Sequence, residues 1–300
     1  MLTFRRPDSL ARTLESIGAI EPPSDTPNRW TIAELLVIDN DTSPSAQGCV
    51  AEAKSNSPMA PIRYIHEPRP GLSAARNRAL DESRGDILVF IDDDEVAGPG
   101  WPDGLVRAMA ATNATLVGGP VRTIFTCDPP RWIVDGKFFS RPEPTDLSTQ
   151  RWLRSGNLAI NICAIRSASI RFDERFGTTG GEDVQFSRHA KAKGLGLSWS
   201  ATAVVSEFVG PERLSLKWLA RRERDSTANW VRVETDQDSR WRIRALIAAR
   251  SATRLSQGAA LVVAGTITTR MHVAAQGVLH MARAVGAIKG IAGQRRPRYR

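Results

Sequence analysis

Cysteine is scarce in this sequence of 300 residues. The three cysteines, Cys49, Cys127 and Cys163, are odd in number, widely spaced and outside any CxxC or Cys/His ligand pattern. They therefore indicate neither a disulfide framework nor a zinc site, and we expect a reducing compartment.

Long uninterrupted apolar runs are also lacking. The opening residues 5–7 are Arg-Arg-Pro and lead into a polar stretch, so we expect no signal peptide. The most apolar later segment, residues 258–277, contains Arg270 and His272 and falls short of the roughly 20 apolar residues that a membrane span needs. An interfacial helix fits this segment better.

Positive charge is in excess, with a formal net charge of +9 and a pI of about 10.2. Such a charge suits nucleic acid, an anionic membrane surface or a phosphorylated substrate. Arginines gather between residues 213 and 254 and in the tail at 294–300. Because carboxylates occupy the expected strand ends, where they would repel phosphate unless a cation intervenes, we expect no nucleic-acid partner.

The first 120 residues alternate helical patterns with short apolar runs, which is typical of a parallel α/β sheet. The expected strands lie at 35–38, 62–65 and 87–91, and the expected helices at 9–17, 43–53 and 73–83. The later part is predicted to contain strands at 115–121 and 157–165, a Pro-rich irregular stretch at 128–150, and helical segments at 214–255 and 259–291.

Polar residues follow two of these expected strands. They are Asp39, Asn40 and Asp41 after the first, and the acidic run at residues 92–94 (Asp-Asp-Asp) after the third. In open α/β sheets ligands bind at the carboxyl ends of strands, so the two clusters would form a site for a cation, such as Mg²⁺ or Mn²⁺, and polar hydroxyls if sheet pairing brings them side by side. Taken alone, the acidic run fits a solvated turn equally well.

A second cluster is Gly180, Gly181, Glu182 and Asp183 ahead of an expected helix. The glycines allow the backbone to approach a ligand closely, and Asp183 is the candidate general base. Taken alone, an acid in the first helical turn fits a dipole-stabilising role better than a catalytic one.

Five short motifs follow one another in a fixed order. They are TFRRP at 3–7, VIDND at 37–41, GLSAARN at 71–77, FIDDD at 90–94 and GGED at 180–183. Together they resemble the family 2 glycosyltransferases of the GT-A fold. Segments at 39–46, 130–132 and 212–219 further resemble the glucosyltransferases of succinoglycan-type exopolysaccharide assembly.

The resemblance implies a Rossmann-like, mostly parallel sheet flanked by helices. It also implies a nucleotide-sugar site, with UDP-glucose as the expected donor and Mg²⁺ or Mn²⁺ as the cation. The implied donor-site residues are Thr3, Phe4 (against the base), Arg6, Asp39 and Asn40 (base and surroundings), Arg76, Asp93 (ribose), and Asp92 and Asp94 (metal).

On the acceptor side the resemblance implies that Asp183 is the base of an inverting mechanism, with Gly181, Glu182, Arg221 and Arg222 nearby. The expected acceptor is a lipid-linked or oligosaccharide glycan, and the expected location is peripheral, on the cytoplasmic face of the inner membrane. The alternatives are a nucleotidyltransferase-like enzyme and a catalytically impaired sugar-nucleotide-binding protein.

The expected organisation is a glycosyltransferase domain at 1–212 and a helical, basic, membrane-associating region at 213–300. The donor half of the domain would be residues 1–120 and the acceptor half 121–212.

Two features depart from the family pattern. Only Met1 and Leu2 precede Thr3, so the innermost strand is expected to be nearly absent, with a mis-called start codon as the first explanation; and Ser206 stands where relatives often have a histidine.

Overall fold

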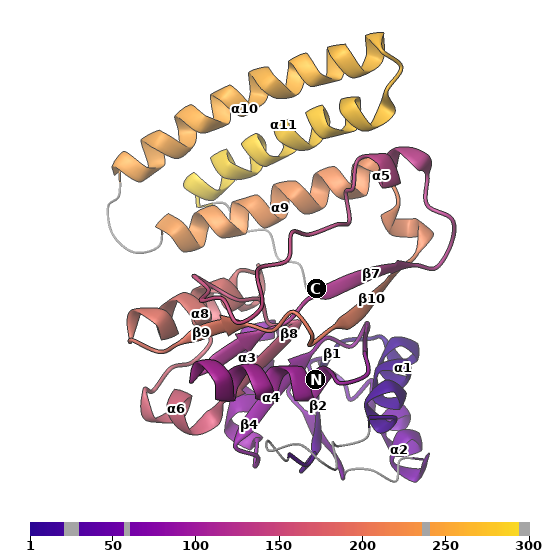
Figure 1. Cartoon of the computed structure of the whole chain (residues 1–300), viewed down its shortest axis with the longest axis vertical. Coiled ribbons are helices and arrows are strands. Elements are labelled where there is room, and N and C mark those ends of the chain that lie inside the picture. Colours follow the sequence, from indigo (N-terminus) through magenta and orange to yellow (C-terminus); the bar gives the residue numbers. More distant parts are fainter. Residues whose placement is uncertain (21–29, 57–60, 236–240, 294–300) are drawn as a thin grey trace.

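The computed structural model describes residues 1–20, 30–56, 61–235 and 241–293. An α/β body carries a separate layer of long helices along one side (Figure 1). The layer consists of α9 (Leu216–Thr235), α10 (Trp241–Ile267) and α11 (Met271–Ile291). The basic tail at 294–300 lies outside the described residues.

The first part of the chain forms the expected parallel sheet. Its strands β1 (Leu2–Thr3), β2 (Leu35–Asp39) and β3 (Ile62–His66) pair in the order β1-β2-β3. The connecting helices are α1 (Pro7–Gly18), α2 (Gln47–Asn56) and α3 (Leu72–Glu82). A parallel bridge between Leu2 and Asp92 joins β1 to the end of β4 (Ile87–Ile91). The innermost strand is as short as expected, and its two residues lie between β2 and the acidic run.

The second part of the chain adds antiparallel pairs. β4 pairs with β8 (Asn157–Asn161), which pairs with β6 (Leu116–Gly118), and β6 runs parallel to β9 (Leu197–Trp199). A separate small sheet has the order β5-β10-β7, formed by β5 (Glu95–Ala97), β10 (Val205–Val209) and β7 (Val121–Phe125). The acidic run thus sits where β4 of one sheet passes into β5 of the other.

Two expected strands are wrong in extent. The apolar run at 157–165 is a strand only to Asn161, whose side chain accepts the backbone N–H of Ala164 and caps helix α6 (Ile162–Ser167). Ile162 and Ile165 are buried three residues apart, which is a helical spacing that a continuous apolar run conceals. The segment at 115–121 divides into β6 and the start of β7, with Gly119 and Pro120 between them.

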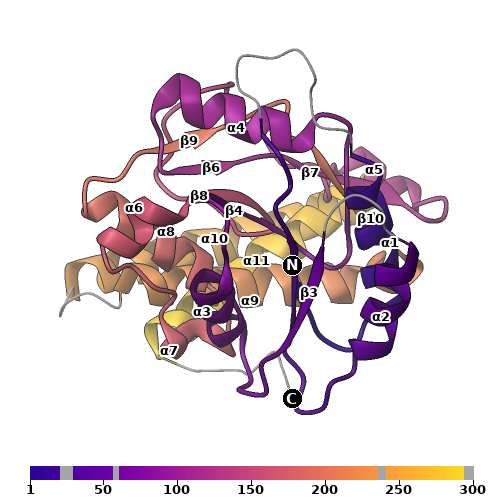
Figure 2. The same ribbon diagram turned by 90° about the horizontal axis from the view of Figure 1, so that it is seen from below.

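Apolar side chains on the two faces of the main sheet form two cores. Val37 points into one core with α1, α2 and α4 (Trp101–Thr112), while Leu36 and Ile38 point into the other with α3, α6 and α8 (Glu182–Ala192). This alternation is the period of two that a strand imposes. Figure 2 shows the two groups of helices on opposite sides of the sheet. The sheet is therefore fixed from both sides, and its strand ends are rigid supports for a site.

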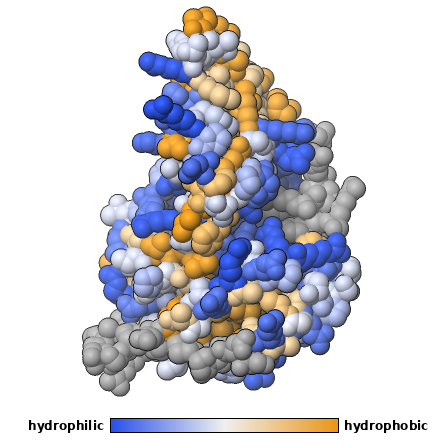
Figure 3. Space-filling model, turned by 90° about the vertical axis from the view of Figure 1, so that its right-hand side faces the viewer, coloured by the Kyte–Doolittle hydropathy of each residue, from blue (hydrophilic) through white to orange (hydrophobic). Residues whose placement is uncertain are grey.

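The helical layer packs through close backbone contacts. In α11, a Cβ on Gly277 would lie 2.5 Å from the carbonyl oxygen of Gly258 in α10, and a Cβ on Gly286 would lie 2.2 Å from that of Arg224 in α9. None of the described helices has the length and apolar character to cross a bilayer. Apolar side chains nevertheless reach the surface of the layer, among them Val263 and Ile267 of α10, with hydrophilic side chains beside them (Figure 3).

Candidate functional site

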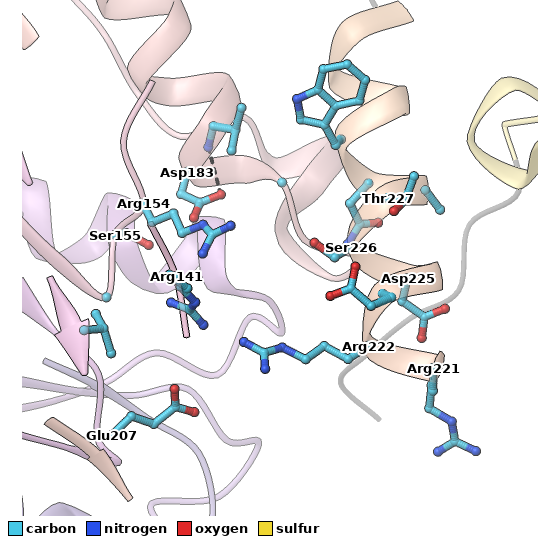
Figure 4. A pocket seen from close by; sticks show the side chains of 18 of the residues that line it. Arg141, Arg154, Ser155, Asp183, Glu207, Arg221, Arg222, Asp225, Ser226 and Thr227 are labelled. Carbon is cyan, nitrogen blue, oxygen red and sulfur yellow. Dashed lines mark hydrogen bonds between the residues drawn. The ribbon is translucent and has the colours of Figure 1, made fainter. Parts of the chain in front are cut away.

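A cleft of about 1780 Å³ lies between the α/β body and the helical layer. Its walls include the acidic run, the start of α8, the irregular segment before β8 and the inner faces of α9, α10 and α11. Figure 4 shows part of this cleft, with Asp183 and Arg154 near one another and Arg222 reaching towards them from α9. Residues far apart in the chain therefore share one cavity.

The acidic run is held by the residues that open the chain. Asp93 is buried and accepts hydrogen bonds from Thr3 Oγ1 at 2.8 Å and Arg6 Nη1 at 3.4 Å. Asp94 accepts from Arg6 Nη1 at 2.9 Å and from Arg213 Nη2 at 3.1 Å. Thr3, Arg6 and the acids, which the sequence analysis grouped at the donor site, therefore lie in one hydrogen-bonded cluster.

Two further carboxyl groups at this position titrate abnormally. The backbone N–H of Asp92 donates to Glu95 Oε2 at 3.1 Å. Burial, together with the charges of Asp94 and Asp93 and against the pull of Arg76, raises the pKa of Asp92 to about 6. Burial also raises the pKa of Glu95 well above its ordinary value, with Asp92 adding to the shift. Carboxyl groups are therefore crowded in a buried position here, which favours their neutral forms unless a cation is present.

The cluster fits a cation that brings ligands of its own. Among the described residues, no three His, Cys, Asp or Glu side chains are gathered as a ready metal cage. Asp92 and Asp94 both line the cleft, and Mg²⁺ is commonly held by one or two carboxylates together with substrate phosphates and water. Arg213 bridges Asp94 and Glu207, donating to Glu207 Oε1 at 2.6 Å, and so supplies part of the positive charge at this position.

The acidic group after β2 does not join this cluster. Asp39 is fully buried and accepts from the backbone N–H of Ala46 at 2.7 Å and from Tyr64 OH at 2.8 Å, and it is not a cleft residue. Asp41 is bound to Arg5, with 2.8 Å between Asp41 Oδ2 and Arg5 Nε. The condition that the two groups lie side by side is therefore not met by Asp39 and Asp41, whose carboxylates hold local structure.

Asn40 and Phe4 do reach the cleft. The Asn40 amide donates to the carbonyls of Glu67 at 2.9 Å and Arg69 at 2.7 Å, and its oxygen accepts from the backbone N–H of Gly71 at 3.0 Å. Asn40 therefore ties the loop before α3 to the end of β2. The proposed contacts of Asp39, Asn40 and Phe4 with a base stay predictions.

Arg76 forms a buried ion pair with Glu182, and both side chains are at most 5% exposed. Burial lowers the pKa of Arg76, but attraction to Glu182, Asp92 and Asp183 outweighs it and the pKa is raised. The guanidinium also lies over Phe172, 5.6 Å from the ring centroid. Arg76 therefore holds the start of α8 against α3, beside both the acidic run and Asp183.

Asp183 occupies the first turn of α8 and lines the cleft. Asp183 accepts a hydrogen bond from the backbone N–H of Val184 at 2.8 Å. The N-cap position of α8 is Gly181, so no side chain caps this helix. Gly180 and Gly181 have φ of 92° and 97°, values that suit glycine, so this turn depends on both residues. The carboxylate is held at a helix start and faces the cleft (Figure 4).

Sequence reasoning missed two cleft arginines, Arg141 and Arg154. Both lie in the irregular segment between α5 (Arg131–Asp135) and β8, where residue spacing carries no geometric information. Of the two expected acceptor-side arginines, Arg222 points towards Arg141 and Arg154, whereas Arg221 points away from them (Figure 4). The sequence signal that could have pointed to this pair is an aromatic residue, Trp152, that stands among arginines in the same segment.

The chain matches the family model described as glycosyl transferase family 2 over residues 1–172. It is 33% identical to the succinoglycan biosynthesis protein ExoM of Rhizobium meliloti (strain 1021), covering 97% of this chain and 91% of that protein. It is also 30% identical to the uncharacterized glycosyltransferase EpsJ of Bacillus subtilis (strain 168), over 33% of this chain and 29% of that one.

Among solved structures, the chain resembles the mannosyltransferase PcManGT from Pyrobaculum calidifontis, determined in complex with GDP-Man and Mn²⁺. The TM-score is 0.59 at 18% identity, with 96% of this chain and 85% of that chain covered. At this identity the likeness supports the fold.

Proposed function

The chain belongs to glycosyl transferase family 2 and is a glycosyltransferase with an α/β GT-A fold, and from this premise we propose its reaction. It transfers a sugar, with inversion, from a nucleoside-diphosphate donor to a growing exopolysaccharide or cell-surface glycan. The observation that carries the proposal is the placement of Asp183 in the same cleft as the acidic run.

On the donor side, Asp93 binds the ribose and is oriented by Thr3 and Arg6, while Phe4 lies against the base. Asp92 and Asp94 would hold a divalent cation, Mg²⁺ or Mn²⁺, which would supply positive charge to the diphosphate leaving group. The similarity in fold to the mannosyltransferase PcManGT, whose structure contains GDP-Man and Mn²⁺, supports a nucleoside-diphosphate donor and a divalent cation.

On the acceptor side, Asp183 accepts the proton of the attacking hydroxyl. The carboxylate needs a fixed orientation for this task, which the Val184 N–H and the glycine turn before α8 supply. Gly181 and Glu182 shape this wall of the cleft, and Glu182 is itself held by Arg76.

UDP-glucose is the proposed donor and a lipid-linked oligosaccharide the proposed acceptor, because the relative that covers nearly the whole chain is a succinoglycan biosynthesis protein. We further propose that residues 1–212 form the catalytic domain and that the helical region at 213–300 rests on the cytoplasmic face of the inner membrane. Val263 and Ile267 on α10 are 58% and 76% exposed, which supports contact with an apolar phase.

The proposal is tested by incubating the protein with a panel of nucleotide sugars, Mg²⁺ or Mn²⁺, and lipid-linked oligosaccharide. We expect Asp183→Asn to lower the rate of transfer by about 10²- to 10⁴-fold while leaving donor binding unchanged in calorimetry. Asp225→Asn is the matched control, since Asp225 is a carboxylate of the same cleft that pairs with Arg224 at 2.7 Å.

Three outcomes would contradict parts of the proposal. Transfer that survives Asp183→Asn removes this residue as the base. Donor binding that is indifferent to a chelator removes the cation. Donor binding without transfer to any acceptor would instead indicate a catalytically impaired sugar-nucleotide-binding protein.

A further inference from the structure

Three arginines from two segments of the chain converge near Asp183 in the cleft. Arg141 and Arg154 come from the irregular segment before β8, and Arg222 comes from α9 on the opposite wall (Figure 4). Among the described residues, none of the three has a carboxylate within 4.0 Å, although ion pairs are plentiful elsewhere in this arginine-rich chain.

The nearest acids are already engaged by other groups. Glu207 binds Arg213 at 2.6 Å, and Glu223 binds Arg283 at 2.6 Å. Asp183 accepts a backbone N–H and attracts Arg154 only through space. The converging arginines therefore carry an excess of positive charge that the surrounding side chains leave largely uncompensated.

The arginines also repel one another, and aromatic rings hold two of them, Arg154 and Arg222, in place. Desolvation by the walls of the cleft lowers the pKa of Arg154 and Arg222, although the Arg154 side chain still meets solvent inside the cleft, and the charge of Arg141 lowers both further. Arg154 lies 5.5 Å from the ring centroid of Trp152, and Arg222 lies 5.3 Å from that of Trp218. Cation–π contacts fix the planar groups without neutralising them, which leaves their N–H donors available to a ligand.

We propose that Arg141, Arg154 and Arg222 form a binding subsite for a phosphate or diphosphate group, beside Asp183 and distinct from the cation site at the acidic run. Guanidinium groups bind phosphate oxygens through paired N–H donors, and a group with two negative charges would relieve the mutual repulsion. The inference rests on the proposed function for the origin of that group, which is either a diphosphate carried by the acceptor or the departing diphosphate of the donor.

The subsite is tested first without turnover. Inorganic pyrophosphate is titrated into the whole chain by calorimetry in the presence of a chelator, so that no cation can recruit it to the acidic run. We expect Arg141→Gln and Arg154→Gln each to weaken binding by about ten- to a hundredfold, the usual effect of losing hydrogen bonds to a charged group. Arg244→Gln, an exposed residue of α10 outside the cleft lining, is the matched control and should leave binding unchanged.

Both test residues are solvent-exposed within the cleft and have no ion pair among the described residues, so circular dichroism and thermal melting should be unaltered in the variants. Absence of pyrophosphate binding to the unaltered chain would overturn the subsite, and so would equal weakening by Arg244→Gln. This titration needs no transfer activity, so its failure and a failure of the proposed function are separately visible.

Steady-state kinetics then identify the source of the group. A rise in KM for the acceptor alone in Arg154→Gln assigns the subsite to an acceptor diphosphate, and a rise in KM for the donor together with weaker UDP inhibition assigns it to the leaving group. Either pattern supports the subsite. Unchanged kinetic constants for both substrates would overturn its role in the reaction.

Discussion

Replacement of Arg76 tests the buried ion pair that joins α3 to α8. Arg76→Met keeps the length of the side chain but removes the countercharge of Glu182, whose side chain is 4% exposed. Removing one partner of a buried pair leaves an uncompensated charge and typically costs about 3–5 kcal/mol of the free energy of unfolding. Because Asp92 and Asp183 also attract Arg76, we expect the loss to fall in that range.

Urea denaturation at neutral pH measures this loss. The double variant Arg76→Met with Glu182→Gln removes both charges and should recover about half of the loss or more, because no lone charge stays buried. Arg78→Met is the matched control on the same helix. Arg78 is 43% exposed and pairs with Glu82 four residues on, so its loss should stay below about 1 kcal/mol.

Two results would refute this account of the pair. One is a loss in Arg76→Met no larger than that in Arg78→Met, which would mean that the pair adds little. The other is a double variant that is no more stable than the single variant, which would mean that the cost comes from packing rather than from the lone charge of Glu182.

Three further predictions concern stability. Hydrogen bonding to Arg5 lowers the pKa of Asp41 from 3.8 to about 2, so the stabilisation lost in Asp41→Asn should be present above pH 4 and should vanish as the pH falls through about 2 in denaturation curves. Gly286→Ala should cost about 1–3 kcal/mol in thermal melts, because its Cβ would lie 2.2 Å from a carbonyl oxygen of α9, whereas Gly48→Ala, with open space around it, should cost nothing. Asn157→Ala should cost about 2–4 kcal/mol by urea denaturation, since this buried amide bonds two carbonyls and an indole N–H; a loss below 1 kcal/mol would contradict it.

The sequence was sufficient for the first half of the fold. The apolar runs at 35–38, 62–65 and 87–91 became β2, β3 and β4. A short apolar run between two helical patterns is a local signal for a buried strand, and it can be recognised without knowing which distant segments pack against it. It was insufficient at 157–165, where an apolar run fits a strand and a buried helix equally, and a single capping side chain, Asn161, decided between them.

For the site, the sequence by itself determined which chemical groups are present and their order: the acidic run after a strand, the glycine turn before Asp183, and the motifs of family 2. The tertiary structure decided which of these groups meet. It turned Asp39 inwards to hold α2, brought Arg76 to Glu182, and gathered Arg141, Arg154 and Arg222 across a cleft. The physical reason is that local periodicity depends on neighbours in the chain, whereas burial and charge pairing depend on segments that can be more than a hundred residues apart, as Arg76 and Glu182 are, and that only the packed fold brings into contact.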